Sequence, residues 1–393
     1  MPASQSKALP QKILTINFGG IGDEILFLPT LKEVKRLLPS CRISLILEPR
    51  SKSVKEVSNL VDEVLLFDIK KKPLKPGDYL ELLNLTRSGK YDLVISSGSS
   101  PMVAMLLFAS GIPVRIGYGT SALSRLLLTH PVPLNKEQYA GNMYHDLSGG
   151  LARYLGQEES SQQKSRQAAV IQIPEVYVQE SSRERMKAAL AEEEAQLEAR
   201  LKDLSSATAT NTDIGTDTTS GAAAKAKKRL LLHPGTSRLA VQKGIIKTWE
   251  SKHWLDLIRK LLKLDNTEVI LAGGPDDEEV MKDLQAELGE EAKRIINFYG
   301  KTKSLADLAA LIEMTDLFIC VDSAPMHVAV GLNKKVVALF GPTEPAKLIP
   351  QTKNFCALTD ASEQVVRSLL DGLGVRLLPD TVFQSSLDLL KQE

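Results

Sequence analysis

Short apolar runs alternate with helix-like segments in two parts of this 393-residue chain, and this alternation limits the folds open to it most strongly. In the first part, the runs at 12–18, 42–48, 61–67 and 91–98 have the length and composition of strands. Helical segments lie between them, and Pro29 is expected to kink the first helix or delay its start. Strands that alternate with helices predict a parallel sheet with crossover helices.

The middle of the chain is polar and repetitive. Residues 183–204 have the pattern of a charged helix, whereas 205–228 is a low-complexity tract with almost nothing to bury, which we expect to be disordered. Strand and helix patterns then resume. We therefore expect an α/β protein with a Rossmann-like N-terminal domain over 1–156, a polar, partly disordered insert over 157–228 and a Rossmann-like C-terminal domain over 229–393, the two domains facing a central cleft.

The composition is that of a soluble globular protein, with 43% hydrophobic and 25% charged residues. No apolar run reaches the roughly 20 residues that a membrane span needs, and the first residues lack the apolar core of a secretory signal, so we expect a cytoplasmic protein. A net charge of +1 gives no reason to expect nucleic acid as a partner. The three cysteines are far apart, which predicts reduced, mostly buried thiols and no zinc site.

The charge is unevenly distributed along the chain. Residues 1–155 carry 19 Lys+Arg against 13 Asp+Glu, and Lys70, Lys71, Lys72 and Lys75 form a cluster. One interpretation is a solvated loop. The other is that this half faces an anionic surface, such as the inner leaflet of a membrane, with the protein bound peripherally.

The hexapeptide Asp322–His327 follows a strand pattern and begins a helix pattern. Ser323 is a good N-cap, and a proline in the first helical turn is well tolerated. The small side chains of Ser323 and Ala324 allow a ligand to approach the backbone, where free N–H groups and the helix dipole favour a phosphate. His327 lies on the first turn and would add a hydrogen bond. The alternative is an ordinary capped helix with a core histidine.

Two other strand ends carry polar groups. Thr236 and Ser237 follow a strand that ends in a glycine turn, and Lys247 offers a cation for a diphosphate, with Lys243 as its competitor because the spacing is long. The alternative for Lys247 is a solvated side chain. Asp277 follows two glycines at the end of another strand, where it would either cap a helix or bond a ribose hydroxyl.

The first strand ends in a glycine turn that leads to Asp23. Gly19, Gly20 and Gly22 resemble a dinucleotide fingerprint, but Ile25 stands where that pattern needs its third glycine. What remains is a tight turn that presents a carboxylate. Asp23 is then either a general base for a substrate hydroxyl or an ordinary N-terminal cap.

Taken together, these segments resemble the family 9 glycosyltransferases, whose best-known members are the lipopolysaccharide heptosyltransferases. The strand–GxGD–helix–PxL pattern lies at 13–31, and the segment SLADLAALIEMTDLFICVDSAPMHVAVGLNKKVVALFGPTEP matches the most diagnostic block of the family. The HPG, KxW and GGPxDxE segments fall between them in the expected order. The similarity covers both halves of the chain but not 157–228.

The resemblance implies a GT-B fold, with the acceptor on the N-terminal domain and the nucleotide-sugar on the C-terminal domain. It also implies an inverting transfer by direct displacement that needs no metal and no cofactor. The roles it implies are as follows: Asp23 as the base, Gly19, Gly20 and Gly22 as the acceptor-side loop, Thr236, Ser237, Lys247 and the Ser323–Ala324 backbone with His327 on the diphosphate, Asp277 on the ribose, and Asp322 on the turn or the donor sugar.

The chain departs from the family pattern at two positions. Residue 324 is Ala where the family usually has Gly, and residue 250 is Glu where members often have Pro. We expect a glycosyltransferase that moves a heptose-like sugar from a nucleoside-diphosphate donor to a lipid-linked or cell-surface saccharide. The alternatives are a non-catalytic nucleotide- or saccharide-binding relative and an NAD-dependent oxidoreductase.

Overall fold

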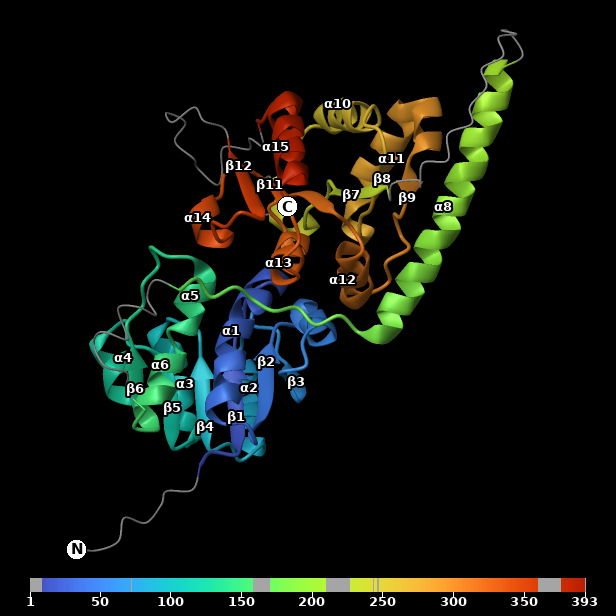
Figure 1. Ribbon diagram of the computed structural model, residues 1–393. Helices are drawn as coiled ribbons and strands as arrows, with labels where there is room; N and C mark the ends of the chain where they lie inside the picture. Colours follow the sequence, from blue (N-terminus) through green and yellow to red (C-terminus); the bar gives the residue numbers. More distant parts are fainter. Residues whose placement is uncertain are drawn as a thin grey trace, which may run out of the picture. The chain divides into compact units, whose positions relative to one another are not determined.

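The computed structural model describes residues 9–71, 73–157, 170–209, 227–242, 244–245, 247–359 and 376–392. The chain forms two compact units (Figure 1). The first contains Met1–Tyr177 with Ala346–Pro350, and the second contains Val178–Pro345 with Gln351–Glu393. Each unit is built around one parallel sheet, as the alternating pattern predicts.

The first unit has a six-stranded sheet with the order β3-β2-β1-β4-β5-β6. In that order the strands are β3 (Glu63–Leu66), β2 (Arg42–Leu47), β1 (Lys12–Ile16), β4 (Leu93–Ser96), β5 (Val114–Tyr118) and β6 (His130–Val132). The helical segments are α1 (Ile21–Leu37), η1 (Pro49–Val57), α2 (Pro76–Ser88), α3 (Pro101–Ser110), α4 (Ala122–Leu127), α5 (Ala140–His145) and α6 (Ser148–Tyr154).

Helix α1 begins immediately after the glycine turn, so the late start considered for Pro29 is wrong. The helix starts at Ile21, and Pro29 lies inside it on a buried face. Proline there removes one backbone hydrogen bond. The helix packs against η1, α5 and α6, and the buried side chains around Pro29 keep it in place despite that loss.

The second unit also has a six-stranded parallel sheet, with the order β12-β11-β10-β7-β8-β9. Its strands in that order are β12 (Phe355–Thr359), β11 (Val336–Phe340), β10 (Leu317–Val321), β7 (Lys228–His233), β8 (Thr267–Leu271) and β9 (Ile296–Asn297). Its helical segments are α8 (Glu180–Ala209), α9 (Arg238–Gln242), α10 (Ser251–Leu261), η2 (Pro275–Asp277), α11 (Glu278–Leu288), η3 (Gly289–Arg294), α12 (Leu305–Glu313), α13 (Ala324–Gly331) and α15 (Pro379–Lys391), and α14 (Pro345–Leu348) begins where this unit's main segment ends.

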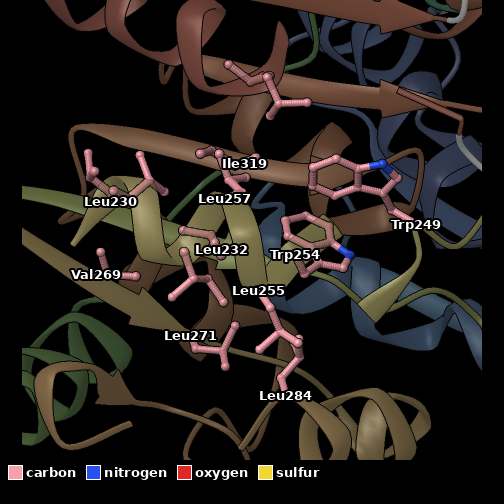
Figure 2. Close-up of a cluster of buried hydrophobic side chains, with 14 of the residues drawn as sticks. Leu230, Leu232, Trp249, Trp254, Leu255, Leu257, Val269, Leu271, Leu284 and Ile319 are labelled. Atoms are coloured by element: carbon pink, nitrogen blue, oxygen red, sulfur yellow. The ribbon is translucent and has the colours of Figure 1, made fainter. Parts of the chain in front are cut away.

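The core of the second unit contains two tryptophans (Figure 2). The rings of Trp249 and Trp254 meet edge to face with their centroids 4.9 Å apart, and both side chains are buried. The Trp249 indole N–H donates to the carbonyl of Leu377 at 2.8 Å. Leucines and other aliphatic side chains from β7, β8 and β10 surround the pair, so α10 and the segment before it are fixed against the sheet.

The charged segment expected as a helix over 183–204 is the centre of α8. Although rich in charge, α8 is part of the second unit, because it packs against α12, β9 and η3 (Figure 1). Ion pairs join Arg183 to Glu313 at 2.7 Å and Arg185 to Asp307 at 2.7 Å. The tract expected to be disordered over 205–228 is ordered at both ends, because α8 continues to Ala209 and β7 begins at Lys228, so the expectation is wrong there. Residues 210–226 lie outside the described residues.

The thiols of Cys41 and Cys320 are buried, that of Cys356 is half-buried, and all three cysteines are free, as predicted. Within the described ranges, no helix combines the length and apolar character required to cross a bilayer.

Candidate functional site

Both sheets reverse their strand order at the middle. In the first unit the reversal lies between β1 and β4, and in the second between β7 and β10. Ligands of open parallel sheets bind beyond the carboxyl ends of the strands at such a reversal. The polar residues singled out from the sequence follow β1, β7, β8 and β10, so each set lies at or beside the reversal of its own sheet.

In the first unit, Asp23 is held in one orientation by two donors. The backbone N–H of Gly20 donates to its Oδ2 at 2.8 Å, and the hydroxyl of Tyr144 donates to its Oδ1 at 3.2 Å. The carboxylate is therefore a helix cap and is also fixed from a second element, α5. A Cβ at Gly19 would lie 2.1 Å from the Asp23 Cβ, so the turn requires glycine there.

Tyr144 is a residue that sequence reasoning missed. It lies 121 residues from Asp23, and no motif marks it. Burial raises the pKa of its phenol, with the charge of Asp23 as a second cause, so the hydroxyl stays protonated and acts as a donor. The loop itself is fixed by Ser51, whose hydroxyl donates to the Gly19 carbonyl at 3.0 Å.

Glu24 follows Asp23 and is buried, with 1% of its surface exposed. Neither of its carboxyl oxygens makes a hydrogen bond of normal geometry with the described residues. Burial raises its pKa well above the ordinary value of 4.5, and the charge of Asp23 adds to this, whereas the Asn17 side chain and the Gly19 backbone act in the opposite direction. Glu24 therefore keeps its proton to a higher pH in the folded chain than in the unfolded chain.

Glu24→Gln is expected to make the protein less sensitive to alkaline pH. The stability that protonated Glu24 allows is complete below its unfolded pKa and is lost as the pH rises through its raised folded pKa. The unfolding free energy of the variant should exceed that of the parent by a margin that grows as the pH rises above the ordinary glutamate pKa of 4.5, by up to about 1.4 kcal/mol per pH unit until Glu24 is ionised in the folded chain. Thermal melts of both proteins across this range provide the measurement. Parallel curves would contradict it.

In the second unit, Lys247, Asp322 and Thr343 form one cluster. The Lys247 Nζ lies 2.6 Å from Asp322 Oδ2, and the Thr343 hydroxyl donates to the same oxygen at 2.6 Å. Asp322 is 2% exposed, whereas the Lys247 side chain is 18% exposed. Because Lys247 is two residues before the buried Trp249, the tryptophan core anchors the segment that carries the ammonium group.

Thr343 was not predicted as a site residue. It follows β11, the neighbour of β10, in the turn Gly341-Pro342-Thr343. A hydroxyl in a glycine–proline turn after a strand is the signal that would have identified it. Lys243, the competitor for the role of Lys247, lies outside the described residues.

Helix α13 begins at Ala324, directly after the end of β10. Ser323 occupies the N-cap position, as predicted, but the expectation that its side chain caps the helix is wrong. Its hydroxyl donates back to the Val321 carbonyl at 3.3 Å instead. The first turn of a helix leaves backbone N–H groups without intrahelical partners, and His327 is buried on this helix with 5% exposure.

Asp277 and His233 form a buried pair. His233 ends β7, and Asp277 ends η2, which follows β8. The Gly274 N–H donates to Asp277 Oδ2 at 2.7 Å, and His233 Nε2 lies 3.7 Å from the same oxygen. Burial raises the pKa of Asp277 and lowers the pKa of His233, and each partner opposes the shift of the other. A Cβ at Gly235 would lie 1.7 Å from Asp277 Oδ1, so only glycine allows this contact.

Two further predicted residues lie on the same turn as Gly235. Thr236 is buried at 9% exposure, and Ser237 is exposed. Within the part of the chain that the structure describes, no group of three or more His, Cys, Asp or Glu side chains is arranged to hold a metal ion.

Comparison with known families removes one of the alternatives left by the sequence. A family model described as glycosyltransferase family 9 (heptosyltransferase) matches residues 81–370. The chain belongs to glycosyltransferase family 9. The resemblance on the sequence motifs is thereby confirmed, and membership of this family selects a glycosyltransferase over a nicotinamide oxidoreductase.

This family 9 member is similar along most of its length to a lipopolysaccharide heptosyltransferase 3 of Escherichia coli. The two are 24% identical over 346 residues, which cover 85% of this chain and 84% of the relative. It is also 30% identical over 162 residues, 38% of the chain, to lipopolysaccharide heptosyltransferase 2 of E. coli K12, of which 44% is covered.

Solved structures confirm the fold class of this family 9 enzyme. The E. coli ADP-heptose lipopolysaccharide heptosyltransferase II is 20% identical, covers 97% of this chain and 98% of its own, and superposes with a TM-score of 0.67. The E. coli heptosyltransferase WaaC with ADP-2-deoxy-2-fluoro heptose is 18% identical, with coverages of 95% and 98% and a TM-score of 0.61. The α/β architecture expected from the sequence is that of GT-B heptosyltransferases.

Proposed function

We propose that this family 9 glycosyltransferase transfers a heptose-like sugar from a nucleoside-diphosphate donor to a lipid-linked or cell-surface saccharide, with inversion and without a metal. The observation that carries the proposal is the Asp23 carboxylate, which the Gly20 amide and the Tyr144 hydroxyl fix at the end of β1. A general base needs such a fixed orientation, because it must meet the substrate hydroxyl within hydrogen-bond reach.

In the proposed reaction, Asp23 accepts the proton of the acceptor hydroxyl. The acceptor oxygen forms a bond to the anomeric carbon of the donor sugar while the bond from that carbon to the diphosphate oxygen breaks. Direct displacement of this kind inverts the anomeric centre. The electron pair of the broken bond remains on the leaving nucleoside diphosphate, which gains negative charge as the transition state is reached.

The second unit would stabilise that charge. We assign the diphosphate to Lys247, to the hydroxyls of Thr236 and Ser237, and to the N–H groups at the start of α13, with His327 beside them. Fixed donors aimed at a developing charge stabilise it without reorganisation. The contacts of Asp322 with Lys247 and Thr343 support its role in the turn, because its charge then orients the ammonium group. Asp277 is assigned to the ribose.

The names of the relatives support the choice of donor. The solved WaaC structure contains ADP-2-deoxy-2-fluoro heptose, and another relative is described as an ADP-heptose heptosyltransferase. For this chain we propose a donor of the same class, an adenosine-diphosphate heptose, and a lipopolysaccharide precursor as the acceptor. A lipid-linked acceptor would place the protein at the inner face of a membrane as a peripheral protein.

A thermal-shift screen tests the donor class. ADP and ADP-sugars are expected to raise the melting temperature more than UDP, GDP or their sugars, because a ligand that binds only the native state stabilises it by about 2.7 kcal/mol at a concentration of 100 times its Kd. The same ADP-sugar is then supplied with a lipopolysaccharide-core acceptor, with and without EDTA. We expect equal turnover in the two conditions.

The outcomes of the screen separate the alternatives. Turnover that EDTA abolishes and Mg²⁺ restores would contradict the metal-independent mechanism. ADP binding without transfer from any ADP-sugar would favour the non-catalytic relative. A melting temperature that no nucleotide raises would contradict the donor assignment itself.

A further inference from the structure

The helices α3 and α4 of the first unit expose large apolar side chains next to each other. The two helices pack against each other. Their exposed apolar side chains, which we call the α3–α4 face, are Met102, Met105 and Phe108 on α3 and Leu123 and Leu126 on α4. Leu126 is 79% exposed and Phe108 is 57% exposed, so these side chains lie largely in solvent.

The outer surface of α3 lacks the polar residues of an ordinary surface helix. Its buried side is formed by Ala104 and Leu107, which pack into the core of the first unit. The opposite side consists of Pro101, Met102, Met105, Phe108 and Ala109, all of which are exposed. Helices that face water normally place charged or polar side chains there, and a contiguous apolar patch marks an interaction surface.

The segment of the chain that contains α3 and α4 carries charges of one sign only. Between Asp92 and Glu137 the chain contains three cations, Arg115, Arg125 and Lys136, and no Asp or Glu. The Arg115 guanidinium lies 5.5 Å from the centroid of the Phe108 ring and donates to the Leu127 carbonyl at 2.9 Å. These contacts place a cation directly beside the apolar side chains.

A second basic group approaches the end of α3. The Arg87 guanidinium donates to the Ala109 carbonyl at 2.6 Å, and the Arg125 guanidinium donates to the Gly119 carbonyl at 3.1 Å. Among the described residues, none of Arg87, Arg115 and Arg125 forms an ion pair with a carboxylate.

Two lysines of the cluster noted in the sequence, unlike these arginines, form ion pairs with carboxylates. Lys70 pairs with Glu48 at 3.3 Å, a carboxylate that Arg50 also contacts, and Lys71 pairs with Asp78 at 2.9 Å, so each of these two lysines has a carboxylate partner within the fold. Lys72 lies outside the described residues. The arginines beside the α3–α4 face have no carboxylate partner among the described residues, so this face is the stronger candidate for contact with an anionic surface.

We propose that the α3–α4 face is the surface by which the enzyme docks on an anionic lipid leaflet. This inference rests on the proposed lipid-linked acceptor and adds the site of membrane contact. The methionine, phenylalanine and leucine side chains would enter the boundary between head groups and acyl chains, while the arginines contact lipid phosphates. The charges argue against a second copy of the chain as the occupant. In a symmetric contact the cations of this segment would face those of the other copy, and the segment between Asp92 and Glu137 offers no carboxylate to compensate them.

Vesicle flotation of the full chain tests the proposal. The protein should float with phosphatidylcholine vesicles that contain phosphatidylglycerol and bind less to phosphatidylcholine alone, and added salt should weaken the difference. Phe108→Ser/Leu126→Ser should lower the partition coefficient about tenfold or more, because two large side chains no longer enter the lipid. Arg125→Gln should lower it about fivefold on the anionic vesicles only.

Two controls keep the test specific. Leu378→Ser replaces a side chain of the second unit that is 65% exposed, and it should bind vesicles like the parent. Met102→Ser/Met105→Ser removes other members of the same face and should also lose vesicle binding. It replaces the first double variant in the test if that variant does not fold. Thermal melts establish that each variant is folded.

The outcomes are distinct. If both double variants still bind vesicles, the proposal is overturned. It is also overturned if the parent does not bind vesicles but forms a dimer that the double variants convert to a monomer. Transfer to a water-soluble acceptor fragment should be unchanged in the double variants. If the parent binds vesicles and the double variants do not, but the parent transfers no sugar, the proposed function is contradicted while the docking surface is supported.

Discussion

Asp23→Asn is expected to lower kcat by about 10²–10⁴, the range for loss of a general base. Asparagine has nearly the same shape as aspartate, and its carbonyl oxygen can still accept the Gly20 N–H that now bonds Asp23. The helix start should therefore be preserved while the proton acceptor is lost. The measurement is single-turnover transfer from an ADP-sugar, with the ADP-induced thermal shift recorded in parallel.

Tyr144→Phe is the matched control for Asp23→Asn. It removes the hydroxyl that orients Asp23 Oδ1 but keeps the carboxylate, so we expect a smaller loss, on the order of tenfold. The ADP-induced shift should be the same in both variants and the parent, since the two residues belong to the first unit. Near-normal transfer by Asp23→Asn would exclude Asp23 as the base.

Lys247→Met is expected to lower kcat by about 10²–10³, because it removes a fixed cation from a leaving group that gains charge. The effect has a second part, since Asp322 would keep Thr343 as a partner but lose the ammonium group. A buried carboxylate without its cation also destabilises the fold. Transfer rate, ADP binding and melting temperature must therefore be measured on the same preparation.

Two variants separate the catalytic part from the structural part. Lys247→Arg keeps a positive charge and should retain more activity than Lys247→Met. Lys247→Met/Asp322→Asn removes both charges, which should recover much of the lost melting temperature but not the transfer rate. If the double variant recovers the rate as well, Lys247 acts only as the partner of Asp322.

The parallel sheets were predictable because their signal is local. Each strand seen from the sequence is a short apolar run, and each crossover helix has its own periodicity, so the pattern does not depend on distant residues. The weaker strands were missed for the same reason. β5 carries Arg115, and β6 is three residues long with a proline, so neither has a strong local pattern.

The candidate site was predictable where one turn contains the whole motif. Asp23 with its glycines, Asp277 with Gly274, and Ser323 with α13 are each within a few residues of their partners. Ser323 shows the limit of this reasoning. Its N-cap position was predicted correctly, but its hydroxyl donates to the Val321 carbonyl and does not accept a hydrogen bond from the helix backbone. Two acceptors close in sequence compete for such a hydroxyl, and local composition does not decide between them.

By itself, the sequence of this family 9 glycosyltransferase determined the two α/β halves, the family and the turns that carry Asp23, Lys247 and Asp322. Only the tertiary structure decided which groups those turns meet. Tyr144 reaches Asp23 across 121 residues, and Thr343 reaches Asp322 because β10 and β11 are neighbours in the sheet. Strand order and helix packing set these contacts, and both arise from burial across the whole unit rather than from any single segment.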